Sequence, residues 1–225
     1  MHHYQDTYKH KGLRNLLAQQ LKSKGIQDEL VLKAIGEIPR HFFLPADFEA
    51  HAYEDKPFPI GEGQTISQPY TVAYQSQLLE LKPGQKVLEV GTGSGYQASV
   101  LLACNVEVYS IERHAALSEK AVKTLQKAFS PAQLEKLHLS VGDGTQGWPE
   151  YAPYDRIIVT AGAPSVPKAL ISQLVNGGIL VIPVGKDEVQ KMVRIVKINE
   201  KDIKTEVFAD FSFVPLVGKN GWKES

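Results

Sequence analysis

The chain has 225 residues, 43% of them hydrophobic, so it is long enough for one well-buried core and falls within the size range of a single α/β domain. Lys plus Arg and Asp plus Glu number 25 each, and this balance excludes a strong overall field that would attract nucleic acid or an anionic membrane. A single cysteine, Cys104, excludes an internal disulfide and a cysteine-built metal cluster. The polar start of the chain and the shortness of its apolar runs predict a cytoplasmic protein.

The first part of the chain predicts two helices and then a loop. Leucines at helical spacing predict one helix that ends by Gly25, and a second apolar repeat predicts another that ends before Pro39. From Pro39 to Pro69, frequent proline and glycine residues predict little regular structure. The decapeptide GEGQTISQPY, residues 61–70, closes this loop-rich part.

Short apolar runs alternate with helical patterns in the middle of the chain, which is typical of βαβ units in a parallel sheet. These five predicted strands are residues 86–90, 106–111, 137–141, 155–160 and 177–185. Two further predicted strands, 190–198 and 204–216, leave no room for a helix between them. We therefore expect a mostly parallel sheet with an antiparallel end.

The turn after the first predicted strand reads EVGTGSGYQ, residues 89–97, and predicts a nucleotide site. Its alternating glycines allow a tight turn and a close approach to a ligand, while the following helix presents its N-terminus. Glu112 lies at the end of the second strand, where a carboxylate can accept hydrogen bonds from both ribose hydroxyls. Asp143 lies at the end of the third strand, well placed for an adenine amino group. The glycines of the turn are Gly91, Gly93 and Gly95.

Each of these features has a purely structural interpretation when it stands alone, because a glycine turn can be a tight turn and an acid can be a loop cap. Their combination favours nucleotide binding. Nicotinamide dehydrogenases usually have a third glycine or alanine where this chain has Tyr96. An acid followed by three alternating glycines instead resembles the first motif of S-adenosylmethionine-dependent methyltransferases, with Glu89 as the acid. Glu89 can also hold loop amides, and the two roles are compatible.

Seven blocks of sequence point to a narrower resemblance. In chain order they read IPRHFFLP, AYEDKPFPIGEGQTISQPY, KVLEVGTGSGYQA, GDGTQGW, APYDRIIVTA, GGILVIPVG and FVPL. In this order they resemble the protein-L-isoaspartate O-methyltransferase family from about residue 13 to residue 216, and GQTISQPY and FVPL are specific to it. The resemblance implies a Rossmann-like class I methyltransferase fold, with helices on both faces of the sheet and a helical N-terminal segment. It implies a single domain, 1–225, with an N-terminal segment (1–60), a cofactor-binding core (61–200) and a C-terminal strand and tail (201–225).

The resemblance also implies an activity. S-adenosyl-L-methionine would donate a methyl group to the free carboxylate of an L-isoaspartyl residue in a damaged protein or peptide. The ester then closes spontaneously to a succinimide, whose hydrolysis returns some normal aspartate. We expect a monomer with no nucleic-acid or membrane partner. We also expect no bound metal, because the histidines show no metal-ligand pattern. We assign no role to His41.

Site residues follow from the same resemblance. The serine of the TISQ block is treated as the active-site residue of the family, which implies Ser67 as the catalytic residue. From the decapeptide alone, a helix N-cap is the favoured interpretation of Ser67, because Pro69 suits the first turn of a helix, and a serine beside a helix start can serve both roles. The residues expected to bind the cofactor are Thr65, Ile66, Ser67, Glu89, Gly91, Thr92, Gly93, Ser94, Glu112, Arg113, Gly142 and Asp143. The residues expected to contact the peptide are Thr65, Ile66, Gln68 and Val214.

Two departures from some relatives limit the transfer, because Val217 replaces a threonine and Tyr70 replaces a histidine. Contacts of those two side chains are not carried over, and the tail GKNGWKES matches no pattern.

Two other functions remain open from the sequence: a methyltransferase with another acceptor, such as a small carboxylate or a protein amine, and a non-enzymatic binding module. A DNA amine methyltransferase is disfavoured because VTAGAP follows the fourth strand where an Asn-Pro-Pro-Tyr-like run would be expected.

Overall fold

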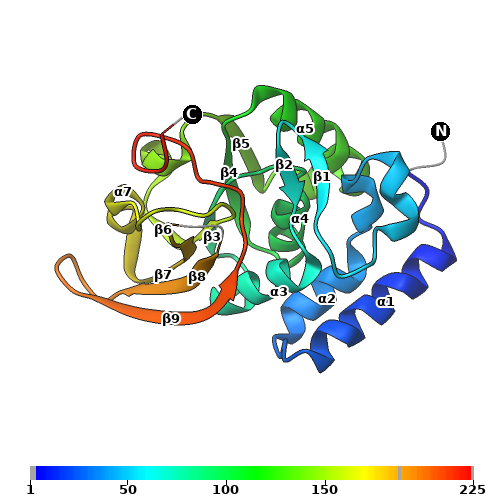
Figure 1. The fold of residues 1–225 in the computed structure, drawn as a ribbon, viewed down its shortest axis with the longest axis horizontal. Helices are drawn as coiled ribbons and strands as arrows, with labels where there is room; N and C mark the ends of the chain where they lie inside the picture. Colours follow the sequence, from blue (N-terminus) through cyan, green and yellow to red (C-terminus); the bar gives the residue numbers. More distant parts are fainter. Residues whose placement is uncertain (1–3, 187–188, 224–225) are drawn as a thin grey trace.

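A seven-stranded sheet forms the centre of the fold (Figure 1). The structure, a computed structural model, describes residues 4–186 and 189–223. In spatial order the strands of the sheet are β5 (Leu137–Val141), β4 (Glu107–Glu112), β3 (Lys86–Val90), β6 (Tyr154–Val159), β7 (Leu174–Val184), β8 (Gln190–Lys197) and β9 (Ile203–Phe211). Neighbours from β5 to β7 are parallel, whereas β7, β8 and β9 pair antiparallel. The predicted mostly parallel sheet with an antiparallel end is confirmed.

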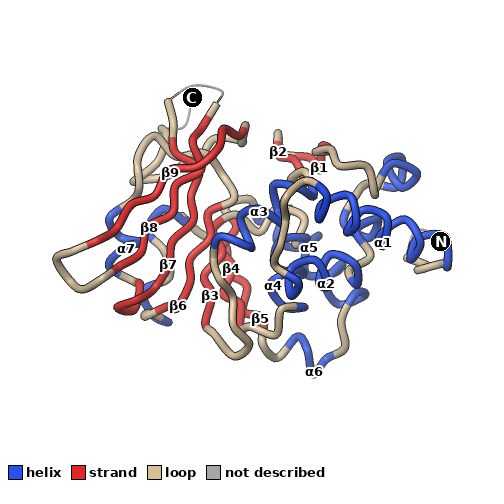
Figure 2. Tube along the Cα trace, turned by 90° about the horizontal axis from the view of Figure 1, so that it is seen from below, coloured by secondary structure: helices blue, strands red, loops and turns tan. Residues whose placement is uncertain are grey.

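Helices cover both faces of the sheet, but unequally (Figure 2). One face carries the longer helices, which are α1 (Tyr8–Ser23), α2 (Glu29–Glu37), α3 (Pro69–Leu78), α4 (Tyr96–Ala103) and α5 (Ala115–Ala128). The opposite face carries α7 (Lys168–Ser172). The remaining short helices are η1 (Arg40–Phe43), η2 (Ala46–His51), α6 (Pro131–Leu134), η3 (Gly144–Gln146) and η4 (Pro149–Tyr151). Within the described ranges, no helix has the length and apolar character needed to cross a membrane.

Strand β3 shows why the central strands read as apolar runs. Val87 packs in the core under the longer helices, whereas Leu88 and Val90 pack in the core on the opposite face. All three side chains are almost completely buried, and burying each stabilises the fold by roughly 1.5–3 kcal/mol. A strand covered on both faces therefore needs apolar residues at consecutive positions rather than alternate ones.

The N-terminal helices pack against α3 and α4, as Figure 2 shows. Helix α2 begins at an N-cap, Asp28, whose carboxylate accepts hydrogen bonds from the amides of Leu30 and Val31. The predicted boundaries are close to those observed, since α1 ends at Ser23 and α2 at Glu37. The helical N-terminal segment is thus part of the same globular core.

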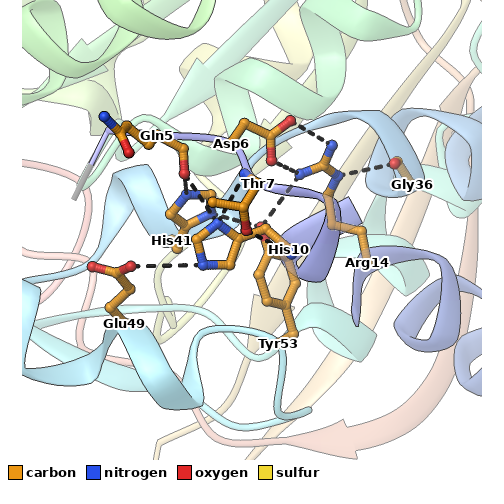
Figure 3. Close-up of polar contacts among 9 residues, drawn as sticks. All are labelled: Gln5, Asp6, Thr7, His10, Arg14, Gly36, His41, Glu49 and Tyr53. Atoms are coloured by element: carbon orange, nitrogen blue, oxygen red, sulfur yellow. Dashed lines mark hydrogen bonds and ion pairs between the residues drawn. The ribbon is translucent and has the colours of Figure 1, made fainter. Parts of the chain in front are cut away.

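A polar cluster fastens the start of the chain to η1 (Figure 3). The ring of His41 is fully buried; its Nδ1 lies 2.7 Å from the Tyr53 hydroxyl and its Nε2 lies 3.3 Å from the Gln5 carbonyl. The His10 ring lies against it, with the ring centroids 3.9 Å apart. Burial, together with the neighbouring His10, lowers the pKa of His41 to about 4. His41, to which the sequence assigned no role, is therefore a neutral anchor at neutral pH.

The same cluster brings together potential metal ligands that are distant in sequence. Ligand atoms of Asp6, His10 and His41 lie within 4.8 Å of one another (Figure 3). Arg14 donates to both oxygens of Asp6, at 2.5 and 2.9 Å, so a cation there would share that carboxylate with a guanidinium. The hydrogen bonds within this cluster are sufficient to anchor the start of the chain to η1. That no metal binds there remains a prediction.

Besides the short helices η1 and η2, the loop-rich part contains a strand pair that the sequence did not predict. Strands β1 (Phe58–Gly61) and β2 (Gln64–Ile66) pair antiparallel as a hairpin, separate from the main sheet. Its turn has positive φ at Gly61, Glu62 and Gly63, which explains the two glycines of GEGQ. The strands were missed because they are only three and four residues long, which is too short for an alternating pattern to stand out.

Candidate active site

A cavity lies at the carboxyl ends of β3, β4 and β6, and β2 and residues 214–217 close it. Parallel strands end at the same edge of a sheet, which is where open α/β sheets bind ligands. The predicted site residues that line this cavity are Thr65, Ile66, Ser67, Gly91, Thr92, Gly93, Ser94, Glu112, Arg113 and Val214. The structure therefore brings together most of a site that was assembled from separate sequence motifs.

The turn after β3 has a shape that only glycine can adopt without distortion at its first position. Gly91 has φ 100°, and a Cβ atom there would lie 2.4 Å from the Thr160 hydroxyl oxygen. That hydroxyl lies 2.7 Å from the Gly91 carbonyl and 3.0 Å from the Val90 carbonyl. Thr160 thus holds the backbone of the turn, and the missing Gly91 side chain lets that backbone border the cavity.

Glu112 supplies the acceptors that the expected ribose requires. It is 4% exposed, and each carboxylate oxygen accepts one backbone hydrogen bond, Oε2 from Gly93 at 2.8 Å and Oε1 from His114 at 2.9 Å. Each oxygen can accept a further hydrogen bond, so the carboxylate can hold the glycine turn and two vicinal hydroxyls together. These two acceptor oxygens fit the ribose hydroxyls of S-adenosyl-L-methionine.

Glu89 lies behind the turn rather than on the cavity wall. Its side chain is fully buried, Oε2 accepts a short hydrogen bond from the Ser110 hydroxyl, and Ser110 in turn contacts the Thr92 hydroxyl at 2.6 Å. Oε1 has no hydrogen-bond partner among the described residues. Burial, with a smaller contribution from the nearby Glu112 carboxylate, raises the pKa of Glu89 to about 8. A cationic ligand in the neighbouring cavity would favour the ionised form of this buried acid.

The raised pKa of Glu89 predicts how stability depends on pH in the ligand-free protein. Between the ordinary glutamate pKa of 4.5 and the raised pKa of about 8, the folded state keeps the proton that the unfolded chain has lost, so stability falls as pH rises through this window. Relative to a Glu89→Gln variant, we expect the wild type to lose on the order of 3 kcal/mol between about pH 5.5 and about pH 7.5. Urea unfolding of both proteins at the two pH values measures this difference. Parallel pH profiles would contradict the assignment.

A second groove adjoins the cavity and shares part of its wall. It is lined by β2, the start of α3 and residues 209–214, and the residues common to both spaces are Thr65, Ser67, Thr160 and Val214. Gln68, one of the residues expected to contact a peptide, lines this groove and not the cavity. Ser67 therefore lies where the two spaces meet.

Ser67 is not a helix cap. The N-cap of α3 is Gln68, which makes no side-chain capping hydrogen bond, and Pro69 occupies the first turn. The capping interpretation of Ser67 is wrong because the helix begins one residue later than that interpretation requires. The Ser67 hydroxyl is half-buried and forms no hydrogen bond with any described residue, so it can donate to a ligand.

Besides Glu89, two further predicted cofactor residues lie off the cavity wall. Gly142 donates its amide to the Glu112 carbonyl at 2.9 Å, which ties the end of β5 to the end of β4. Asp143 caps η3, and its carboxylate accepts hydrogen bonds from Thr145 and from the amide of Lys219. Partial burial would raise the pKa of Asp143, but these donors outweigh it and lower the pKa below 3.8. An adenine contact to Asp143 remains a prediction.

The structure also adds residues that the sequence did not indicate. Thr160 follows β6 directly, and its place at the carboxyl end of a central strand is the one signal that could have identified it. Tyr96 lines the cavity at the start of α4, with the buried guanidinium of Arg40 4.7 Å from its ring centre. The bulky residue that argued against a nicotinamide site is thus almost fully buried beside Arg40.

Comparisons with known proteins identify the family. The sequence model of "Protein-L-isoaspartate(D-aspartate) O-methyltransferase (PCMT)" matches residues 12–221. A protein-L-isoaspartate O-methyltransferase of Cytophaga hutchinsonii is 59% identical over 97% of this chain and 96% of its own length, and one of Christiangramia forsetii is 57% identical over 94% and 97%. A crystal structure from Plasmodium falciparum, described as this enzyme in complex with S-adenosyl-L-homocysteine, superposes with a TM-score of 0.79 at 27% identity, covering 91% of this chain and 98% of that one.

These matches extend over nearly the whole chain and include the segments that form the cavity and the adjoining groove. The residues matched by the family model, 12–221, include the glycine turn and the TISQ block. On this evidence the chain belongs to the protein-L-isoaspartate(D-aspartate) O-methyltransferase family.

Proposed function

We propose that the cavity binds S-adenosyl-L-methionine and that the adjoining groove binds the isoaspartyl peptide, so that the two reactants meet at Ser67. The observation that carries this proposal is the wall common to both spaces, formed by Thr65, Ser67, Thr160 and Val214. The enzyme methylates the free carboxylate of L-isoaspartyl residues, which starts their return to normal aspartyl residues through a succinimide.

The chemistry of the acceptor explains why the groove needs no base. A carboxyl group has a pKa of about 4, so the isoaspartyl carboxylate is already ionised at neutral pH. S-adenosyl-L-methionine supplies the methyl group, which it carries on a positively charged sulfonium sulfur. The contribution of the protein is then to bring the two reactants together and align them, which can account for several kcal/mol of the barrier.

The groove is suited to orient an anion without neutralising it. None of the residues that line it, all within the described ranges, is a lysine, arginine or histidine, and the one acid among them, Asp210, is paired with Lys191 at 2.6 Å. A tight ionic clamp would stabilise the carboxylate before reaction and so reduce its nucleophilicity, whereas hydroxyl and amide donors orient it more weakly. The uncharged TISQ segment fits this requirement, because the hairpin and Pro69 fix its shape.

Within this arrangement each expected contact residue has a specific place. The Ser67 hydroxyl donates to the acceptor carboxylate, while Thr65 and Ile66 form the wall between cofactor and peptide. The carbonyl of Val214 already accepts from the Gly162 amide at 2.8 Å, so we expect Val214 to offer its amide group to an extended peptide. Gln68 contacts the peptide on the far side of Ser67.

A Ser67→Ala variant tests the catalytic assignment. Loss of one neutral hydrogen bond to the acceptor should lower kcat/KM for an isoaspartyl peptide about tenfold, because such a bond contributes about 1 kcal/mol or somewhat more. The affinity for S-adenosyl-L-homocysteine, measured by calorimetry, should change much less. Steady-state methylation assays give the first quantity.

The matched control is Ser212→Ala, which removes a hydroxyl from the groove but not from the shared wall. We expect it to change kcat/KM less than threefold. Equal effects of the two substitutions, or full activity of the Ser67 variant, would contradict a catalytic role for Ser67.

We further propose that the enzyme acts as a monomer in the cytoplasm on isoaspartyl-containing proteins and peptides, without nucleic acid or a membrane as partner. The balance of 25 basic and 25 acidic residues and the single, buried Cys104 support this assignment. Sedimentation of the purified protein tests the oligomeric state, for which we expect a species of about 25 kDa, the mass of one chain.

A further inference from the structure

The last part of the described chain folds into a small closed loop, residues 218–222, which we call the C-terminal clamp. The amide of Gly218 donates to the Trp222 carbonyl at 3.0 Å, and the amide of Trp222 donates to the Leu216 carbonyl at 2.8 Å. Figure 1 shows this loop in red near the C-terminus, beside the segment that follows β5. No sequence motif assigned it a role.

The clamp holds the loop after β5. The amide of Lys219 donates to Oδ2 of Asp143 at 2.8 Å, and the amide of Asn220 donates to the hydroxyl of Thr145 at 3.0 Å. The Asn220 side chain adds a contact to the Thr145 carbonyl at 3.3 Å. Because two of these bonds come from backbone amides, they depend on the path of the clamp more than on the identities of its side chains.

The clamp also holds the loop after β6. The indole Nε1 of Trp222 donates to the Gly162 carbonyl at 2.9 Å. The same carbonyl accepts from the amide of Leu216 at 2.8 Å. Trp222 thus fastens the clamp to the point where residues 214–217 run alongside the end of β6.

Each segment that the clamp contacts contributes to the cavity wall. Gly144 lies between Asp143 and Thr145, Ala161 precedes Gly162, and residues 214–217 form another part of the wall. We infer that the C-terminal clamp positions these three segments and thereby sets the shape of the cofactor cavity on its adenosine side, with Trp222 as the main positioning residue. The adenosine side is assigned because β5 lies next to β4, whose Glu112 faces the expected ribose.

The packing of the clamp leaves little freedom for another path. A Cβ atom on Gly221 would lie 2.2 Å from the Leu216 carbonyl oxygen and 3.1 Å from Cγ2 of Thr145. A Cβ atom on Gly218 would lie 2.1 Å from Oδ1 of Asp143. A substitution at either glycine therefore forces the clamp, or the segment that it contacts, to move.

This inference rests on the proposed placement of S-adenosyl-L-methionine in the cavity, and calorimetry with S-adenosyl-L-homocysteine tests it. A chain that ends at Val217 should bind this ligand about tenfold more weakly or worse, since several hydrogen bonds that shape the site are lost. A chain that ends at Lys223 keeps the clamp and should bind like the wild type. The KM for S-adenosyl-L-methionine should rise in the shorter chain, while kcat and the KM for an isoaspartyl peptide change less than threefold.

Point variants separate positioning from general stability. Trp222→Phe keeps an aromatic side chain but removes the Nε1 donor, and Gly221→Ala displaces the clamp; each should weaken ligand binding about fivefold or more. Their controls are Trp148→Phe, because Trp148 lies outside the cavity wall, and Gly12→Ala, because a Cβ atom on Gly12 meets nothing within 4 Å. Thermal unfolding of each ligand-free variant shows whether the fold itself has weakened.

The inference holds if ligand affinity falls while the unfolding temperature of the ligand-free variants stays within a few degrees of the wild type. Unchanged affinity in the chain ending at Val217 overturns it, and tighter binding would show instead that the segment competes with the ligand. Affinity that falls only together with a large loss of thermal stability also overturns it, because the clamp would then be a general structural element. Absence of binding in the wild type would refute the proposed function rather than the clamp alone.

Discussion

Replacing Gly91 with alanine is expected to weaken S-adenosyl-L-homocysteine binding by more than a hundredfold. The backbone at Gly91 has φ 100°, a conformation that costs a residue with a side chain on the order of 1–3 kcal/mol. The added Cβ atom would also lie 2.4 Å from the Thr160 hydroxyl oxygen, so one of the two must move. Because the Thr160 hydroxyl holds the carbonyl of this turn, that movement distorts the cavity wall itself. Calorimetric titration of the ligand measures the loss.

The matched control is Gly84→Ala. Gly84 has φ 83°, but a Cβ atom there meets nothing within 4 Å, and Gly84 does not line the cavity. This variant should lose stability of about 1–2 kcal/mol from the positive φ alone and keep its ligand affinity. If Gly91→Ala bound the ligand as well as Gly84→Ala does, the close approach of the turn to the cofactor would be refuted.

The second large effect is expected at Glu112. In Glu112→Gln, an NH₂ group replaces one carboxylate oxygen and must face a backbone amide, either that of Gly93 or that of His114. One buried donor is then left without an acceptor, which costs about 1–3 kcal/mol, and the expected ribose loses a charged acceptor. We expect ligand affinity to fall about a hundredfold, measured by the same titration.

Glu107→Gln is the control for this substitution, because Glu107 lies on the same strand, β4, at the end away from the cavity. Its carboxylate contacts the Tyr109 hydroxyl and His138, so the change perturbs only the local surface. We expect its ligand affinity to stay within threefold of the wild type. A Glu112→Gln variant that kept full affinity would remove Glu112 from the cofactor site.

The sheet could be predicted from the sequence because its central strands are buried on both faces and therefore read as continuous apolar runs. Strand β3 was predicted at 86–90 and observed at Lys86–Val90. The last strand was predicted to continue to residue 216 but ends at Phe211. The FVPL block leaves the sheet there and follows the end of β6, where Pro215 forms an isolated bridge with Gly162.

The site was predictable where chemistry is encoded in adjacent residues, as in the glycine turn and the TISQ block. It was less so where a role depends on which loops meet in space. Thr160, at the end of β6, contacts the Gly91 carbonyl at the end of the neighbouring strand β3, and Asp143 contacts the amide of Lys219, 76 residues later in the chain. Neither contact follows from local spacing, because side-chain period and turn chemistry describe only near neighbours in sequence.

The position of Ser67 shows how a local signal can mislead. A serine two residues before a proline is a reasonable helix cap, yet α3 begins at Pro69 with Gln68 as its cap. The short hairpin of β1 and β2 holds Thr65 and Ile66 in extended backbone up to this point. This places Ser67 at the junction of the two spaces instead of on the helix end.

The central claim, that the groove beside Ser67 binds the isoaspartyl carboxylate, is tested most directly by radiolabelled methyl transfer. The two acceptor peptides differ only in an isoaspartyl or a normal aspartyl linkage. We expect base-labile label from S-adenosyl-L-methionine on the isoaspartyl peptide and only background on its aspartyl counterpart. Equal labelling of the two peptides, or label on neither while S-adenosyl-L-homocysteine still binds, would contradict the assignment of the groove beside Ser67 as a site for the isoaspartyl carboxylate.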